Sequence, residues 1–205
     1  DGLLYLKSGS KEQNILAKQG DDLRIDWGYF YMVAGKENTA YSVGNSTELR
    51  KNFVNGTLNS ASLEGEDSNG NMALVRSHGK VKNVTDKIML GYDDIYSIQY
   101  FGTNLRPYWN SKGDRTIEAE MLAAYNEYDK LLARCYAFDK KLMEDASAAG
   151  GKEYAELCAL AYRQSIAAHK LVEAPNGDLL WLSKENNSNG CINTVDLTYP
   201  SAPLY

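Results

Sequence analysis

The sequence has no excess of basic residues and no long apolar run. Its 22 lysines and arginines stand against 27 acidic residues, for a formal net charge of −5. A nucleic-acid partner is therefore not expected, because displacing counterions from a phosphate backbone requires a concentrated basic face. No apolar stretch is long enough to cross a bilayer, so we expect no membrane partner either.

The start of the sequence carries no recognisable targeting segment. A secretory leader combines positive charge, an apolar run and small residues, and no such combination opens this chain. The first residue is Asp1 rather than methionine. We therefore interpret the sequence as a processed or cut piece of a longer protein.

Cysteine and histidine are both scarce. Cys135, Cys158 and Cys191 lie too far apart for a disulfide framework, and none belongs to a Cys-x-x-Cys pair. With only His78 and His169 present, most zinc sites are excluded and a Ser-His-Asp mechanism would depend on one of two residues. No metal site and no cofactor is predicted.

The stretch around which the chain is organised is residues 90–110, LGYDDIYSIQYFGTNLRPYWN. It mixes large aromatic side chains with Asp93, Asp94 and Arg106. Burying this combination would take charged groups out of water, and exposing it would leave a large apolar area in contact with solvent. One resolution is the wall of a concave site, where rings supply contact area and a few polar groups fix orientation. The alternative is a domain junction whose tyrosines cap two cores.

Residues 1–90 predict β-structure. The best strand is expected over 23–33, where apolar and charged residues alternate before the run YFYMV. Residues 40–43 and 52–54 indicate further strands, and Asn69-Gly70 favours a hairpin turn. Many short strands separated by turn signals are typical of an antiparallel sandwich.

The later part of the chain predicts a helical hairpin. Apolar residues recur at steps of three and four over 117–146, after the capping residue Thr116, and indicate one long amphipathic helix that Gly150-Gly151 ends. A second helix is expected over about 152–172. Its residues 157–168 are almost all apolar or small, so we expect it to be enclosed by protein on most sides.

A surface helix joined to a buried helix by a short turn is the repeating unit of two-layer helical rings and solenoids. One hairpin cannot close such a ring. Either further helices follow Tyr205, or the hairpin packs against the sandwich. The sequence therefore predicts an α+β fold.

A polar loop near the C-terminus is a second candidate region. The Asn176-Gly177 turn leads into an apolar strand, which is followed by Lys184, Glu185 and several asparagines, and Asp196 lies in a strand-like run. Loops on a rigid scaffold are where sites usually form. A solvated turn is the alternative.

Four blocks of the sequence resemble the glutaminase A-like family. They are RIDWGY at 24–29, GYDDIYSIQYFGTNLRPYWN at 91–110, LAYRQSIAAHKL at 160–171 and SKENNSNGCINTVDLTYPSAPL at 183–204. The family contains secreted proteins of fungi and gut-type bacteria that are several times longer, with a β-sandwich region followed by a helical domain similar to six-hairpin glycosidase toroids.

The resemblance implies a domain division and a location. Residues 1–90 would be the end of the β-sandwich, and 91–205 the start of an (α/α) toroid-like domain whose partner is the remaining helical domain of the full-length protein. The protein would be secreted, periplasmic or at the cell surface. It would hydrolyse L-glutamine to L-glutamate and ammonia.

An enzyme that acts on free glutamine needs a carboxylate for the substrate ammonium, a cation for the substrate carboxylate, and a group that activates water. The candidate catalytic residues are Asp94, Glu185 and Asp196, and the candidate substrate-binding residues are Asp93, Tyr96, Arg106, Trp109 and Lys184. Asp93 or Asp94 would bind the ammonium, Arg106 or Lys184 the carboxylate, and Glu185 or Asp196 would activate water.

Two alternatives remain open. Glycoside hydrolysis requires two carboxylates across a sugar-binding cleft, which the same acidic residues could supply, and the tyrosines suit stacking on sugar faces. The chain could instead be a structural or carbohydrate-binding piece without chemistry. The expected small-molecule substrate is accordingly glutamine or a sugar.

Overall fold

The structure is a computed structural model that describes residues 2–18, 26–58, 70–184 and 190–202. The chain divides into two compact units. The first unit comprises Asp1–Gly9 and Tyr29–Asp93, and the second comprises Ser10–Gly28 and Asp94–Tyr205. Antiparallel sheets and α-helices occur together, so the predicted α+β class is confirmed.

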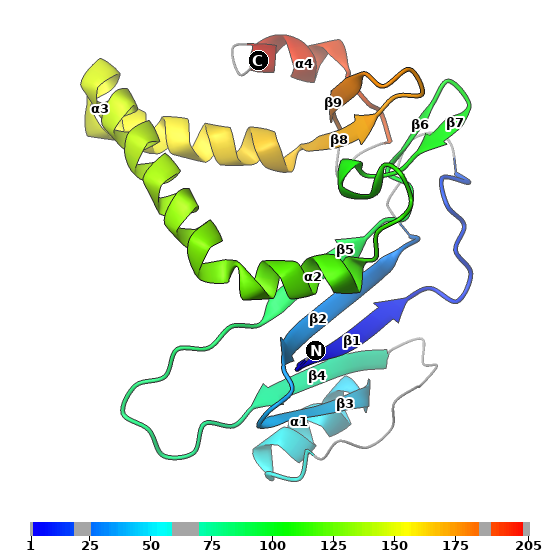
Figure 1. Cartoon of the computed structure of the whole chain (residues 1–205), viewed down its shortest axis with the longest axis vertical. Coiled ribbons are helices and arrows are strands. Elements are labelled where there is room, and N and C mark those ends of the chain that lie inside the picture. Colours follow the sequence, from blue (N-terminus) through cyan, green and yellow to red (C-terminus); the bar gives the residue numbers. More distant parts are fainter. Residues whose placement is uncertain (1, 19–25, 59–69, 185–189, 203–205) are drawn as a thin grey trace. The chain divides into compact units, whose positions relative to one another are not determined.

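The first unit contains a three-stranded antiparallel sheet in the order β1-β2-β5 (Figure 1). Its strands are β1 (Leu3–Gly9), β2 (Tyr29–Gly35) and β5 (Met89–Asp93). In the register, Leu6 pairs with Met32 and Tyr31 pairs with Gly91. Tyr31 and Val33 are buried, as alternation along a strand with one covered face requires.

The strand expected over 23–33 begins only at Tyr29 within the described residues, because Gly28 takes a φ of 87° and breaks the extended run. The strand expected over 52–54 is wrong. Those residues end the helix α1 (Ser46–Val54), which Asn45 caps by accepting a 2.9 Å hydrogen bond from the Thr47 amide.

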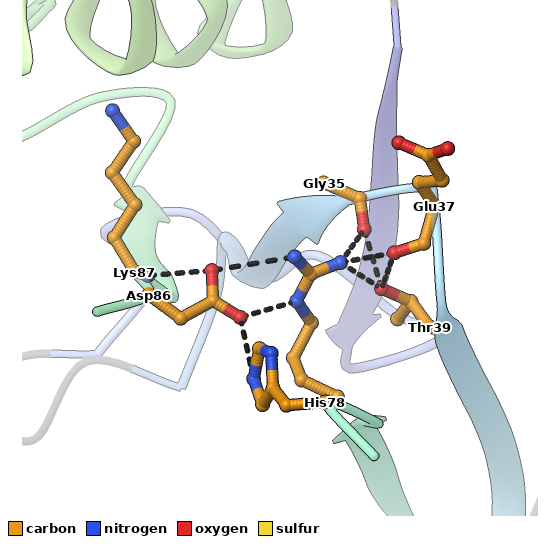
Figure 2. Close-up of polar contacts among 7 residues, drawn as sticks. Gly35, Glu37, Thr39, His78, Asp86 and Lys87 are labelled. Carbon is orange, nitrogen blue, oxygen red and sulfur yellow. Dashed lines mark hydrogen bonds and ion pairs between the residues drawn. The ribbon is translucent and has the colours of Figure 1, made fainter. Parts of the chain in front are cut away.

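Arg76 fixes the ends of the second sheet of the first unit, which pairs β3 (Thr39–Asn45) with β4 (Gly70–Arg76). Its guanidinium donates to the carbonyls of Gly35 (2.6 Å) and Glu37 and to the Thr39 hydroxyl (2.6 Å). The same group binds both oxygens of Asp86, at 2.6 and 3.3 Å (Figure 2). One side chain therefore connects the β2–β3 turn to the irregular segment 77–88.

The second unit begins with two short strands and ends with a small helix. In chain order its elements are β6 (Ile98–Tyr100), β7 (Thr103–Leu105), the 3₁₀ turn η1 (Tyr108–Asn110), α2 (Ile117–Asn126), α3 (Tyr128–Ala167), β8 (His169–Glu173), β9 (Leu179–Ser183) and α4 (Val195–Ser201). Its core is formed by Ile98, Leu105 and Val172, which packs the β6–β7 hairpin against β8.

The predicted helical hairpin is present as two arms of α3 joined at a kink (Figure 1). Gly151, with φ 84° and ψ −179°, interrupts the helical backbone in a conformation that is essentially restricted to glycine. Thr116 caps α2 through the Ala119 amide, but Glu127 leaves the helical conformation and divides the expected single helix.

The second arm of α3 ends at Ala167 rather than near 172, because β8 begins at His169. Leu157 and Leu160 on this arm are 63% and 53% exposed. The described part of the chain therefore does not provide the enclosure expected for this helix. None of the described helices is long and apolar enough to cross a membrane.

The turn between β6 and β7 carries an aromatic residue in an unfavourable conformation. Phe101 has φ 45° and Gly102 φ 80°, which is the pattern of a two-residue hairpin turn that favours Asn-Gly. The Phe101 side chain is 92% exposed, so its ring contributes little burial, although it contacts Tyr100 edge-on at 4.6 Å.

Replacing Phe101 with asparagine is therefore expected to raise the free energy of unfolding by about 0.5–1 kcal/mol, since relief of backbone strain exceeds the lost ring contact. Urea denaturation of the chain measures the change. Phe101→Leu is the matched control, because it removes the ring without relieving the strain. A gain in stability for leucine equal to that for asparagine would contradict this account.

Candidate functional site

The most deeply buried carboxylate of the central stretch is Asp94, which is 4% exposed. Its Oδ2 accepts hydrogen bonds from the Ser97 hydroxyl at 2.7 Å and from the Lys170 ammonium at 3.0 Å. The Trp27 indole N–H donates to the Asp94 carbonyl at 2.7 Å and to the Tyr96 carbonyl at 3.1 Å. The Asp94 carboxyl group is thus buried and bonded to a hydroxyl and an ammonium group.

The ammonium group of a second lysine, Lys184, lies near Trp27 of this site. Its Nζ is 5.9 Å from the centre of the Trp27 ring. Burial lowers the pKa of Lys184, the charge of Lys170 lowers it further, and the charge of Asp94 acts in the opposite direction. We call Trp27, Asp94, Ser97, Lys170 and Lys184 the Asp94 cluster.

The β8–β9 hairpin places the two lysines on one face. Lys170 of β8 pairs with Leu182 of β9, and Lys184 follows two residues after Leu182. Because successive side chains of a strand point to opposite faces, Leu182 and Lys184 share the face of Lys170. The Lys184 amide also donates to the Ala168 carbonyl at 2.8 Å, which extends the pairing beyond the strand.

A separate pocket of about 430 Å³ lies beside the β6–β7 hairpin. Two of the predicted residues, Tyr96 and Arg106, line it together with Lys112 and Glu173. The guanidinium carbon of Arg106 lies 4.7 Å from the centre of the Tyr96 ring, and its Nη2 donates to the Tyr96 hydroxyl at 3.4 Å.

The other sequence-predicted residues are distributed more widely. Trp109 belongs to η1 and lines a different pocket of about 300 Å³. Asp93 ends β5 in the first unit. Asp196, expected in a strand-like run, instead lies exposed in the first turn of α4, whose N-cap residue is Thr194. Glu185 lies outside the described residues.

The structure therefore unites two of the predicted residues, Asp94 and Lys184, and adds Lys170 and Trp27. The sequence contained a weak signal for Lys170, because it stands in an apolar strand where a charged side chain needs a partner. Trp27 gave no signal for its indole bond, since the acceptor carbonyl is 67 residues away in the chain. Among the described residues, no group of three or more His, Cys, Asp or Glu could hold a metal ion.

Comparisons with known proteins cover the whole chain. Residues 1–145 match a family model described as a domain of unknown function, DUF5127, and residues 151–205 match one described as the glutaminase A six helical-hairpin domain. "Glutaminase A" of Aspergillus oryzae is 27% identical over 221 residues, and "Probable glutaminase" of Arthroderma benhamiae is 25% identical over 228.

These alignments cover 100% and 98% of this chain but only 31% and 25% of the two relatives. The chain therefore spans less than a third of the length of the curated relatives that it matches. No solved structure matches it.

Proposed function

This chain belongs to the glutaminase A-like family, and from that premise we propose that it is part of a secreted amidohydrolase that converts L-glutamine to L-glutamate and ammonia. The names of the two fungal relatives support the reaction. Because the chain covers only 31% and 25% of those relatives, the activity is proposed for the full-length protein.

The observation that carries the proposal is the pairing of Asp94 with Lys170 at 3.0 Å in a site whose charges also act on the ammonium of Lys184. A glutamine site needs a cation for the α-carboxylate, and Lys184 supplies one beside the Trp27 ring. Lys170 already neutralises Asp94 at 3.0 Å, so the positive charge of Lys184 is available for a ligand. Asp94 then acts as a positioning residue that holds the ammonium group of Lys170 in place.

In the proposed reaction, water adds to the side-chain carbonyl carbon of glutamine and ammonia leaves after the nitrogen is protonated. A general base must take a proton from the attacking water. Glu185, the neighbour of Lys184 in the sequence, is the predicted base, with Asp196 as the alternative. The glycosidase alternative needs a second carboxylate across a cleft from Asp94. Among the described residues, the charged neighbours of Asp94 in the cluster are Lys170 and Lys184.

We also propose that the sheets of the first unit end a β-sandwich and that α3 opens an (α/α) toroid-type domain. The match of residues 151–205 to a six helical-hairpin domain supports the toroid part of this assignment, from the second arm of α3 onward. An apolar groove of about 810 Å³ between the two arms of α3 also supports it. The rings of Phe138 and Tyr162 line this groove, with their centres 5.2 Å apart. The remaining helical domain of the full-length protein would cover this groove.

Ammonia release by the full-length protein tests the proposed function. Glutamine should be hydrolysed, Glu185→Gln should reduce kcat by about a hundredfold or more, and Lys184→Met should mainly raise KM, since it removes a group that binds substrate and transition state equally. Lys141→Met is the control, because Lys141 is exposed on α3 and pairs only locally with Asp145. Release of reducing sugar from glycans without ammonia from glutamine would reject the proposal.

A further inference from the structure

We propose that the pocket around Arg106 is a second ligand site, which binds the carboxylate group of a small monoanionic ligand at a position separate from the Asp94 cluster. Its lining includes Tyr96, Asn104, Arg106, Lys112 and Glu173, and it excludes Trp27, Asp94 and both lysines of the cluster. The inference does not depend on the proposed reaction.

The Arg106 guanidinium contacts two neighbouring residues, Tyr96 and Gly113. Its guanidinium lies against the Tyr96 ring at 4.7 Å and bonds the Tyr96 hydroxyl. Gly113 lies against the same group, since a Cβ at this position would stand 3.2 Å from Arg106 Nε. Gly113 also has φ 73°, so a residue with a side chain would be strained there for two reasons.

The charge of Arg106 has no carboxylate partner within 4.0 Å among the described residues, and the Tyr96 hydroxyl is its hydrogen-bond partner there. The nearby acid, Glu173, binds Lys112 Nζ at 2.5 Å and the Ser111 hydroxyl at 2.9 Å. The Lys112 ammonium and then the Ser111 hydroxyl lower the pKa of Glu173, so it stays ionised and committed to these partners. Arg106 lines the pocket, and its guanidinium carries more N–H donors than the one bonded to Tyr96.

The charges of the pocket favour a monoanion. Arg106 and Lys112 contribute two positive charges and Glu173 one negative charge. A planar guanidinium matches the two oxygens of a carboxylate with two parallel hydrogen bonds. Glu173 repels a dianion such as phosphate, and a neutral sugar would leave the Arg106 charge unmatched.

Calorimetric titration of the full-length protein tests this assignment. The probes are L-glutamate and D-glucuronate as carboxylates on different frameworks, inorganic phosphate as a dianion, and D-glucose as a neutral molecule. At least one carboxylate should bind more tightly than phosphate and glucose. Its affinity should fall about tenfold or more in Arg106→Lys, which keeps the charge but loses the paired geometry.

Two further variants locate the ligand. Gly113→Ala should also weaken binding, because the added Cβ displaces the guanidinium, while Arg115→Lys should not, because Arg115 is exposed and paired with Glu120. Failure of both carboxylates to bind, or unchanged affinity in Arg106→Lys, would overturn the proposal. It would equally be overturned if Lys184→Met weakened binding as much as Arg106→Lys, since the ligand would then occupy the Asp94 cluster.

Discussion

Replacing Asp94 with asparagine is expected to lower the free energy of unfolding by about 2–3 kcal/mol. The carboxylate is 4% exposed and binds Lys170, so its loss leaves that ammonium without a counter-charge next to Lys184. Breaking a fully buried ion pair is more costly, but the Lys170 side chain is 32% exposed and can reach water. Urea denaturation measures the change.

The burial of Asp94 therefore changes what a substitution there can show. Loss of activity in Asp94→Asn would combine a stability effect with a catalytic one, and the double variant Asp94→Asn with Lys170→Met separates the two. Because it removes both charges of the pair, the double variant should be more stable than Asp94→Asn alone. If the double variant is less stable than the unsubstituted protein by the sum of the two single effects, the coupling between Asp94 and Lys170 is zero and the ion pair contributes nothing.

The same variants should move the pKa of Lys184 in opposite directions. Lys170→Met removes a repulsive charge and should raise this pKa, whereas Asp94→Asn removes an attractive charge and should lower it further. Because the folded pKa lies below the unfolded value of about 10.4, the unfolded chain binds more protons between these two values. Stability should therefore rise with pH in that window, and Lys184→Met should abolish the rise.

Replacing Arg76 with methionine is expected to lower the free energy of unfolding by about 3 kcal/mol. The substitution leaves the carbonyls of Gly35 and Glu37 without their charged donor and breaks the paired contact with Asp86 (Figure 2). A hydrogen bond from a charged group contributes about 1.5–3 kcal/mol, and methionine retains most of the apolar stem. Urea denaturation again gives the magnitude.

Asp86→Asn is the comparison variant for Arg76, because it removes the ion pair with Arg76, together with the 3.1 Å contact between Asp86 and His78, and leaves the carbonyl contacts intact. Its effect should be smaller than that of Arg76→Met. The hydrogen bond from Arg76 is the largest cause that holds the pKa of Asp86 below its ordinary value. The resulting stability is present above the unfolded pKa of about 3.9 and is lost as the pH falls through the folded value, so Arg76→Met should weaken this acid dependence. A loss of stability in Asp86→Asn as large as that in Arg76→Met would contradict the contribution assigned to the carbonyl contacts.

Local signals predicted those parts of the fold that depend on a few neighbouring residues. The Asn176-Gly177 turn is confirmed, with the Gly177 amide bonded to the Ala174 carbonyl at 2.9 Å, because such a turn closes within five residues. The helical hairpin is confirmed for the same reason, since Thr116 and Gly151 act on their own helix ends. The strand expected over 52–54 was wrong because the cap at Asn45 lies outside the short apolar run on which the expectation depended.

The candidate site was only partly predictable. Asp94 and Lys184 were predicted from their residue types and their surroundings, but nothing in the sequence paired them with each other or with Lys170, which is 76 residues from Asp94. Arg106 was predicted to bind the substrate carboxylate in the same site as Asp94 and Lys184. The structure instead places it in a different pocket, against Tyr96 and Gly113.

The sequence by itself determined the α+β class, the hairpin and its turns, and the family to which the chain belongs. Each of these follows from short-range patterns or from continuous blocks of residues. Only the tertiary structure decided that Lys170 is the lysine that pairs with Asp94, and that Arg106 lines a pocket without a carboxylate partner among the described residues. Those pairings depend on strand register and on packing between distant segments, and a one-residue shift in the β8–β9 register would turn Lys170 to the opposite face.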